Sequence, residues 1–271
     1  MNAAQKNRFI KTVKDYYAEH GRHDLPWRQT TNPYKIAVSE IMLQQTQVSR
    51  VVEKYKEFLK AFPNAKSLAA APLQQVLLLW SGLGYNRRAR FLQQMAKAVN
   101  DEYKGKFPKT FDELLALPGI GHYTAGAISA FAYNQPTVFI ETNIRTVYLH
   151  CFFHDSTDSV TDKELLPLIA ATLDRENPRE WYWALMDYGS HLKSTGVRIH
   201  RKSAQYAKQS TFKGSLRQVR GAIIKILTIN TMTLLKLEKD LPFEKVRIEE
   251  ALQTLIKEKL VVKKGKQYSI S

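Results

Sequence analysis

The sequence contains almost no cysteine, because Cys151 is the single one among 271 residues. One thiol cannot form an internal disulfide, and it cannot supply the several ligands of a cysteine-bound metal cluster. No hydrophobic run approaches the roughly 18–20 residues of a membrane-spanning helix. Residues 1–13 are polar and basic, without the apolar core of a signal peptide. We therefore expect a soluble, cytoplasmic protein that has no membrane partner.

Acidic residues are also scarce relative to basic ones. The chain has 25 Asp+Glu and 41 Lys+Arg, which gives a formal net charge of +16. Residues 189–271 hold 18 Lys+Arg and 6 Asp+Glu, so +12 of this charge lies in the last part of the chain. Because a strongly basic protein attracts polyanions, the charge predicts a nucleic-acid partner.

Apolar residues at helical spacing dominate the first 191 residues, which predicts an all-α body. The predicted helices are residues 7–18, 33–45, 48–62, 64–71, 72–80, 86–103, 110–117, 124–133, 142–150, 161–173 and 178–191. Residues 25–34 are interpreted as a loop punctuated by prolines, and residues 137–140 as a short β-like segment.

The C-terminal region has a different pattern. Residues 194–212 are polar and basic, as in a linker, and residues 215–229, 231–239 and 243–259 are predicted helices. Residues 260–270 have the pattern of a β-hairpin that turns near Gly265. Three helices followed by a hairpin indicate a small winged-helix-like α+β domain. The alternative is a helical appendage with a frayed tail.

A glycine-containing turn joins two of the predicted helices. In the string LPGIGHYTAG at residues 117–126, one helix ends near Pro118 and the next begins after Gly121. Glycines allow another molecule to approach the backbone, and the first N–H groups of a helix suit a phosphate. A lone pair of glycines would indicate an ordinary turn between helices. The whole string resembles the helix-hairpin-helix element of DNA repair glycosylases.

Further motifs resemble one family within the helix-hairpin-helix (HhH-GPD) superfamily, the MutY-type adenine DNA glycosylases. They are PWR at 26–28, PYK at 33–35, SEIMLQQTQ at 39–47, WSGLGY at 80–85 and RAR at 88–90. The resemblance covers residues 20–192 in unbroken order. It implies a two-lobed helical body, with 1–30 plus 135–212 as the first lobe. Residues 31–134 are then an inserted lobe that carries the hairpin, and 213–271 a basic winged-helix-like domain.

The resemblance also implies catalytic roles. Glu40 matches the general acid that protonates the departing base, which requires a desolvated carboxyl group. Glu141 matches a carboxylate that stabilises the sugar cation, Asn143 the asparagine that orients it, and Tyr123 the tyrosine beside the flipped base. Taken singly, each glutamate has the pattern of a solvated surface residue.

Other residues match the DNA-binding surface of the family. Gln45 and Tyr85 match wedge residues that fill the gap left by an extruded base, with Leu43 and Gln44 beside them. The candidate backbone contacts are Arg28, Arg88, Gly119, Gly121, His122, Thr124, Lys193 and Arg201. In the C-terminal region they are Lys213, Arg217, Arg220, Lys263, Lys264 and Lys266. A capping role is equally compatible with His122, and exposed basic side chains are often only solvated.

The chain departs from the family at three places. Glu141 stands where the family has aspartate. The positions of the four cysteines that bind an iron–sulfur cluster fall on Lys193, His200, Ser203 and Gln209, so we expect no cluster. The usual C-terminal domain that recognises 8-oxoguanine is not recognisable. A monovalent cation at the carbonyls of the 117–122 turn is a further expectation from the resemblance.

We therefore expect a monomeric, nucleoid-associated DNA glycosylase that acts on double-stranded DNA containing a mismatch or a damaged base. The expected substrate is adenine opposite guanine or 8-oxoguanine. Tyr123 occupies the position where strand-cleaving relatives carry a lysine, which predicts base removal without strand cleavage. Two alternatives remain open: a mismatch thymine or uracil glycosylase, and a non-catalytic protein that binds DNA lesions on a glycosylase fold.

Overall fold

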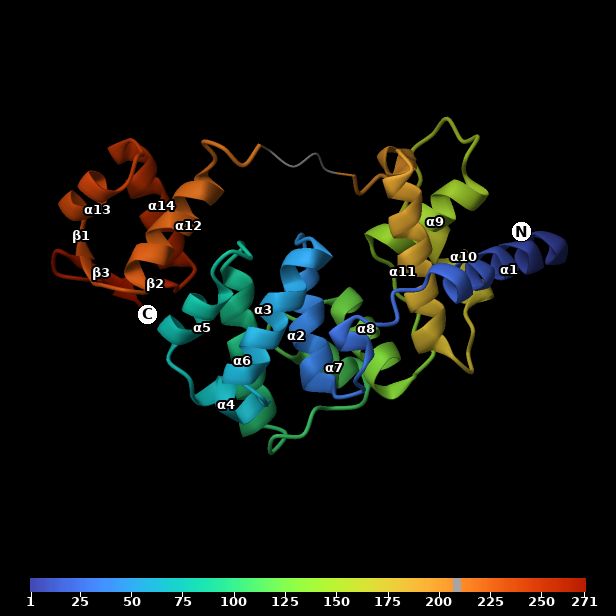
Figure 1. Ribbon diagram of the computed structural model, residues 1–271, viewed down its shortest axis with the longest axis horizontal. Coiled ribbons are helices and arrows are strands. Elements are labelled where there is room, and N and C mark those ends of the chain that lie inside the picture. Colours follow the sequence, from blue (N-terminus) through green and yellow to red (C-terminus); the bar gives the residue numbers. More distant parts are fainter. Residues whose placement is uncertain (207–210) are drawn as a thin grey trace. The chain divides into compact units, whose positions relative to one another are not determined.

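Helices make up most of the protein. The structure is a computed structural model that describes residues 1–206 and 211–271 (Figure 1). The chain divides into two compact units. The first comprises Met1–Ala37, Lys109–Ala116 and Ile120–Lys208, and the second comprises Val38–Pro108, Leu117–Gly119 and Gln209–Ser271. In the described part of the chain, no helix combines the length and the apolar character needed to cross a membrane.

The first unit is built around helix α11. Its elements are α1 (Ala3–His20), η1 (Pro26–Arg28), α7 (Phe111–Ala116), α8 (His122–Tyr133), α9 (Thr142–Phe152), α10 (Asp162–Thr172), α11 (Pro178–Ser194) and η2 (Ile199–Lys202). Helix α11 packs against α9, α1 and α8. Val13, Tyr148 and Leu185 are fully buried in this core. Helices α9 and α11 cross closely because Gly189 has no side chain: a Cβ there would lie 2.3 Å from the carbonyl oxygen of Asn143.

The second unit contains a helical layer and the C-terminal domain. The helices are α3 (Val48–Ala61), α4 (Ala65–Ala70), α5 (Leu73–Trp80) and α6 (Arg87–Asp101), and the last residues of α2 (Pro33–Leu43) join them. Helix α6 packs against α4 and α5. Phe58, Trp80 and Leu92 form part of the core and are fully buried.

The C-terminal region folds as the predicted winged-helix-like domain. It contains α12 (Leu216–Leu227), β1 (Met232–Thr233), α13 (Leu234–Asp240), α14 (Lys245–Lys257), β2 (Val261–Lys264) and β3 (Gln267–Ile270). The strands form an antiparallel sheet in the order β1-β3-β2. The β2–β3 turn requires Gly265, whose φ of 59° favours glycine. The predicted fold class, an all-α body with a small α+β domain, is confirmed.

Some local predictions need correction. Residues 137–140 form no strand. The Tyr182 hydroxyl instead donates to the Thr137 carbonyl at 2.8 Å and accepts from the Phe139 N–H at 3.4 Å. A side chain thus provides the hydrogen bonds that a neighbouring strand would otherwise make with these backbone groups. The proline-rich loop contains the 3-10 helix η1, and α8 begins at His122 rather than at residue 124.

The predicted linker at 194–212 contains η2 and a parallel bridge between Ser203 and Val160. Its residues 207–210, including Gln209, lie outside the described residues. In the two-unit division α8 belongs to the first unit, whereas the sequence placed it in the inserted lobe. The three-part domain division stays a prediction.

Candidate active site

Glu141 caps the N-terminus of α9. Its Oε1 accepts hydrogen bonds from the backbone N–H groups of Asn143 at 2.7 Å and Ile144 at 2.9 Å. These groups have no partner within the helix, so a side-chain acceptor stabilises them. Aspartate is the more usual cap. The longer glutamate folds back onto its own helix, which fixes its carboxylate at the start of α9.

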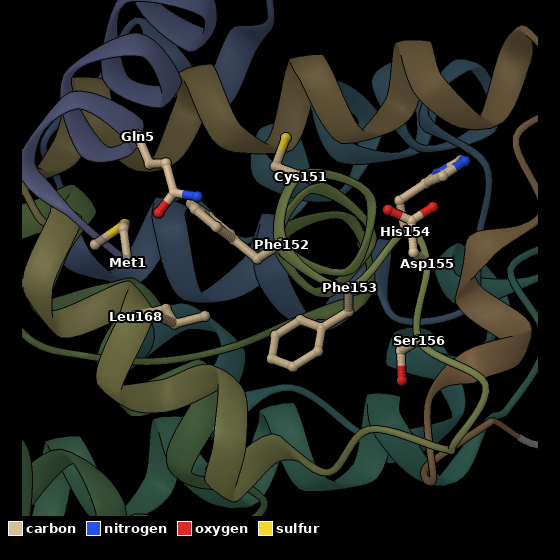
Figure 2. Close-up of a pocket in the computed structure, with 9 residues that line it drawn as sticks. All are labelled: Met1, Gln5, Cys151, Phe152, Phe153, His154, Asp155, Ser156 and Leu168. Carbon is tan, nitrogen blue, oxygen red and sulfur yellow. The ribbon is translucent and has the colours of Figure 1, made fainter.

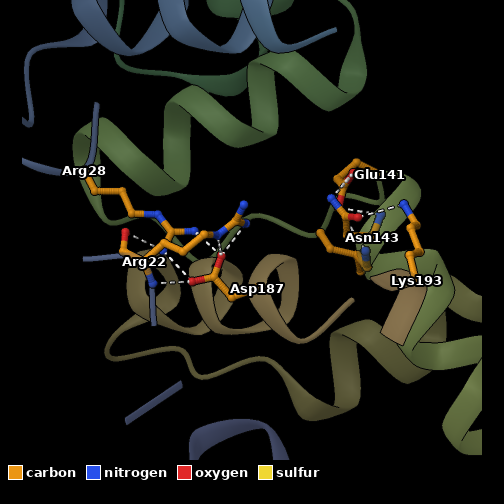
Figure 3. Close-up of polar contacts among 7 residues, drawn as sticks. Arg22, Arg28, Glu141, Asn143, Asp187 and Lys193 are labelled. Atoms are coloured by element: carbon orange, nitrogen blue, oxygen red, sulfur yellow. Dashed lines mark hydrogen bonds and ion pairs between the residues drawn. The ribbon is translucent and has the colours of Figure 1, made fainter. Parts of the chain in front are cut away.

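Asn143 and Lys193 extend this cap into a three-residue cluster (Figure 3). Asn143 Nδ2 donates to Glu141 Oε2 at 3.4 Å, and Lys193 Nζ donates to Asn143 Oδ1 at 2.7 Å. Burial lowers the pKa of Lys193, Glu141 opposes that shift, and Arg145 adds to it. The Lys193 ammonium thus has an internal partner, and its predicted phosphate contact stays a prediction.

The glycine turn leads into α8, where Tyr123 lies half-buried with its ring 5.9 Å from that of Phe139. His122 is exposed beside Phe111. Gly121 is the N-cap residue of α8, and no side-chain hydrogen bond caps this helix. Beyond the adjoining residues, no heavy atom of the described chain lies within 4 Å of the position that a Cβ of residue 121 would occupy. Gly119 is exposed with a φ of 77°. The N-terminus of α8 thus keeps the geometry expected of a phosphate contact.

Thr124 does not fit the predicted DNA-binding set. Its side chain is only 2% exposed, so it belongs to the core of the first unit and the prediction is corrected. Arg201 is exposed, as a phosphate contact requires.

In the second unit, Glu40 lies near the end of α2 with an exposed fraction of 4%. Its neighbours Ser39, Ile41 and Met42 are also buried. This placement excludes the interpretation of Glu40 as a solvated surface carboxylate. A general acid needs a carboxyl group that is shielded from water in this way.

Gln45 and Tyr85 share an unusual backbone conformation. Their φ values are 55° and 47°, in the left-handed region that non-glycine residues seldom adopt. Gln45 is exposed, while Leu43, Gln44 and Tyr85 are half-buried. Strained backbone of this kind concentrates at functional sites.

Arg88 connects the two segments that carry these residues. Its guanidinium donates to the carbonyls of Ile41 at 2.8 Å and Met42 at 3.0 Å, and to those of Leu83 at 3.0 Å and Gly84 at 3.1 Å. Burial lowers the pKa of Arg88 to about 10, which leaves it protonated at neutral pH. This side chain connects two segments of the protein, and its predicted phosphate contact stays a prediction.

Arg217 of α12 provides a contact that the sequence did not suggest. Its Nη1 donates to the hydroxyl oxygen of Tyr85 at 2.5 Å, and its guanidinium lies 5.4 Å from the centre of that ring. Arg220 is paired with Glu258 and donates to Thr254. Both arginines were predicted to contact DNA, and both are committed to protein partners.

The predicted DNA contact of Arg28 is also corrected, because this side chain binds inside the protein (Figure 3). Its side chain is 4% exposed and donates to the two carboxylate oxygens of Asp187 at 2.7 and 2.8 Å. Arg22 donates to the same carboxylate through its backbone N–H and Nε, each at 2.8 Å. Burial alone raises the pKa of Asp187, but the hydrogen bonds from Arg28 and Arg22 outweigh it, and the pKa is lowered.

The residues at the four cluster positions do not fit an iron–sulfur cluster. Lys193 donates to Asn143, and Ser203 pairs through its backbone with Val160. None of the four is a cysteine, whereas iron–sulfur clusters are held by thiolates. The monovalent cation at the 117–122 turn stays a prediction.

A pocket of about 470 Å³ lies elsewhere in the first unit (Figure 2). Its lining residues are Met1, Gln5, Cys151, Phe152, Phe153, His154, Asp155, Ser156 and Leu168. None of them is a predicted site residue, so this pocket is separate from the candidate active site.

Known proteins resemble the chain in sequence and fold. The model of the HhH-GPD superfamily base excision DNA repair proteins matches residues 38–170. Adenine DNA glycosylase from Mycolicibacterium smegmatis is 33% identical over 268 residues, which are 90% of this chain and 89% of that protein. The Buchnera aphidicola (subsp. Baizongia pistaciae) enzyme of the same name is 39% identical over 182 residues, 67% of this chain and 52% of that one.

The chain spans about half the length of several of these relatives. Among solved structures, a thermostable thymine-DNA glycosylase superposes with a TM-score of 0.62 at 24% identity, covering 69% of this chain and 87% of that one. A trapped endonuclease III–DNA covalent intermediate superposes with a TM-score of 0.57 at 21% identity, covering 71% of this chain and 86% of that one. These likenesses show the fold. The sequence matches place the chain in the HhH-GPD superfamily of base excision DNA repair proteins, in the family of the adenine DNA glycosylases.

Proposed function

We propose that the protein is a monofunctional DNA glycosylase that removes adenine paired with guanine or 8-oxoguanine in double-stranded DNA. The observation that carries the proposal is the carboxylate of Glu141, fixed by the start of α9 and by the side-chain amide of Asn143. The names of the relatives support adenine as the base.

The proposed reaction breaks the bond between the base and C1′ of the sugar. Glu40 donates a proton to the departing purine, so that the base leaves as a neutral molecule. The Glu141 carboxylate stabilises the positive charge that develops on the sugar. Water then adds at C1′ and loses a proton to the Glu141 carboxylate. This scheme requires both glutamates to face one nucleotide, and that convergence is part of the proposal.

The target base must leave the duplex before either carboxyl group reaches it. Gln45 and Tyr85, held in left-handed conformations on segments that Arg88 connects, are the proposed wedge. The exposed glycines of the 117–121 turn bind the DNA backbone. Tyr123 offers no amine for a Schiff base, so the strand stays intact.

Release of free adenine from defined duplexes tests this function. Adenine is placed opposite guanine, 8-oxoguanine or thymine, and parallel duplexes carry mispaired thymine or uracil. We expect adenine release from the first two duplexes, and Glu40→Gln and Glu141→Gln to slow it by about 10²–10⁴-fold. Asp15→Gln, a change at an exposed residue of α1, is the matched control.

The other outcomes identify the alternatives. Release of thymine or uracil in place of adenine supports the mismatch thymine or uracil glycosylase. Tight binding to mismatches with no release of any base contradicts the enzymatic proposal and supports a lesion-binding protein. Covalent trapping with borohydride would contradict the monofunctional assignment.

A further inference from the structure

Lys193 lies on α11, one helical turn beyond Gly189 and on the same face. The absence of a side chain at Gly189 lets α11 approach the backbone of Asn143, where a Cβ would lie 2.3 Å from the carbonyl oxygen. This close crossing brings the Lys193 ammonium within 2.7 Å of Asn143 Oδ1. Lys193 also stands at a position where the family resemblance expects a cluster cysteine.

The chemistry of the two side chains fixes the direction of these bonds. An ammonium has three donors and no acceptor, so only the oxygen of the Asn143 amide can face Lys193. The amide nitrogen must then point the other way, toward Glu141 Oε2 at 3.4 Å. Arg145, the other cation that acts on Lys193, is occupied by Asp162 at 2.7 and 2.8 Å.

We propose that Lys193 is a positioning residue that holds the Asn143 amide in the one orientation in which its N–H groups support the Glu141 carboxylate. The ammonium also places a positive charge behind that carboxylate, at the far end of the Asn143 side chain. The inference rests on the proposed function, because Glu141 is taken as the reacting carboxylate.

Single-turnover base release with enzyme in excess over DNA tests the role. Lys193→Met keeps the aliphatic stem and removes the donor, and we expect it to slow release by about 10- to 100-fold, as small misplacements of catalytic groups do. Lys193→Arg keeps a permanent donor-only cation and should recover most of the lost rate. Lys202→Met removes a half-buried lysine that donates to the Ser156 carbonyl and should leave the rate unchanged.

The pH profile separates positioning from a merely structural role. Burial is the main cause of the lowered pKa of Lys193. As the pH rises through this lowered pKa, the ammonium loses its proton, so the rate of base release by the wild type should fall at alkaline pH. With Lys193→Arg that fall should move to higher pH, because a guanidinium stays charged. An unchanged alkaline limb in Lys193→Arg contradicts the proposal.

The side-chain amide NMR signals of Asn143, assigned with Asn143→Asp, give a readout that does not depend on activity. We expect Lys193→Met to shift them and Lys202→Met to leave them in place. If the wild type releases base while Lys193→Met matches its rate and leaves the signals unmoved, the positioning role fails and the glycosylase function stands. If no base is released by the wild type, the proposed function fails, and unmoved signals overturn the positioning role as well.

Discussion

At the scale of single residues, the arginines illustrate how poorly charge alone predicts function. Arg28, Arg88 and Arg217 were all candidates for DNA contacts, and all three bind protein atoms. A guanidinium carries five donors, so a carboxylate or a cluster of carbonyl oxygens inside the protein satisfies it as well as a phosphate does. The choice depends on which acceptors the fold brings near.

Asp187 provides a test of this internal role. Asp187→Asn removes the charge that balances Arg28 and Arg22, and breaking such a buried pair typically costs about 3–5 kcal/mol of unfolding free energy. Urea denaturation at neutral pH measures the change. Asp15→Asn at the exposed pair with Lys11 is the control and should have no measurable effect.

The same carboxylate predicts a pH dependence of stability. The pKa of Asp187 is lowered in the folded protein, so its stabilising effect is present above the unfolded pKa of about 3.9 and is lost as pH falls through the folded value. We expect the wild type to lose stability below about pH 4. Asp187→Asn should lack this contribution, and equal acid-induced losses in both proteins would contradict the assignment.

Glu141 is expected to have a structural effect that is separable from catalysis. Glu141→Ala removes the acceptor for the first N–H groups of α9 and should lower the unfolding free energy by about 1 kcal/mol. Glu141→Asp, which keeps a favoured capping residue, should cost clearly less. Thermal unfolding of both variants decides whether the cap contributes as the geometry indicates, and equal losses would argue against it.

At the scale of elements, α8 uses glycine in two different ways. Gly126 is buried in the helix, and a Cβ there would lie 2.8 Å from the Cβ of Phe139, so the residue permits close packing. Gly121 has open space around it and an ordinary φ of −101°, so the fold does not require glycine there. The proposed approach of a phosphate to this turn would account for Gly121.

Substitutions at these two glycines should therefore differ in their effects. Gly126→Ala should destabilise the protein by about 1–3 kcal/mol through overpacking. Gly121→Ser, which introduces a favoured N-cap residue, should keep the stability. It should weaken binding to a duplex about tenfold or more, the equivalent of one hydrogen bond to a charged group. Unchanged affinity, measured by fluorescence anisotropy, would remove the turn from the proposed interface.

At the scale of the whole molecule, the excess of positive charge remains the property that favours DNA. The wing residues Lys263, Lys264 and Lys266 are exposed, and none of them forms an ion pair among the described residues. Lys263 lies 5.5 Å from the centre of the Tyr268 ring, and all three lysines are exposed enough for phosphate contacts. We infer that the wing contributes to a sequence-independent grip on the duplex.

Salt dependence measures that contribution. Replacing the three wing lysines by glutamine should weaken binding and reduce the slope of log K against log salt by roughly one unit for each phosphate that the wing no longer neutralises. Replacing Lys6, Lys11 and Lys14 of α1 removes the same charge from another surface. If both triple variants change the slope equally, net charge rather than the wing governs binding.

Much of this organisation was predictable from the sequence. Helical periodicity and turn residues depend on near neighbours in the chain, so most helices, the glycine turn before α8 and the hairpin at Gly265 were predicted correctly. The segment at 137–140 was not, because a distant hydroxyl, that of Tyr182, satisfies its backbone.

In the candidate site too, some features were predictable from the sequence and others depended on the fold. The family, the lack of cluster cysteines and the residue types at Glu40, Glu141, Asn143 and Tyr123 follow from the amino-acid sequence, since these depend only on the order of residues. The folded chain was needed to show that Lys193 bonds to Asn143, that Arg88 joins two separate segments and that Arg28 is buried against Asp187. Such pairings join residues that lie far apart in the sequence, and a charged group selects its partner only after packing has brought the available acceptors within hydrogen-bonding distance.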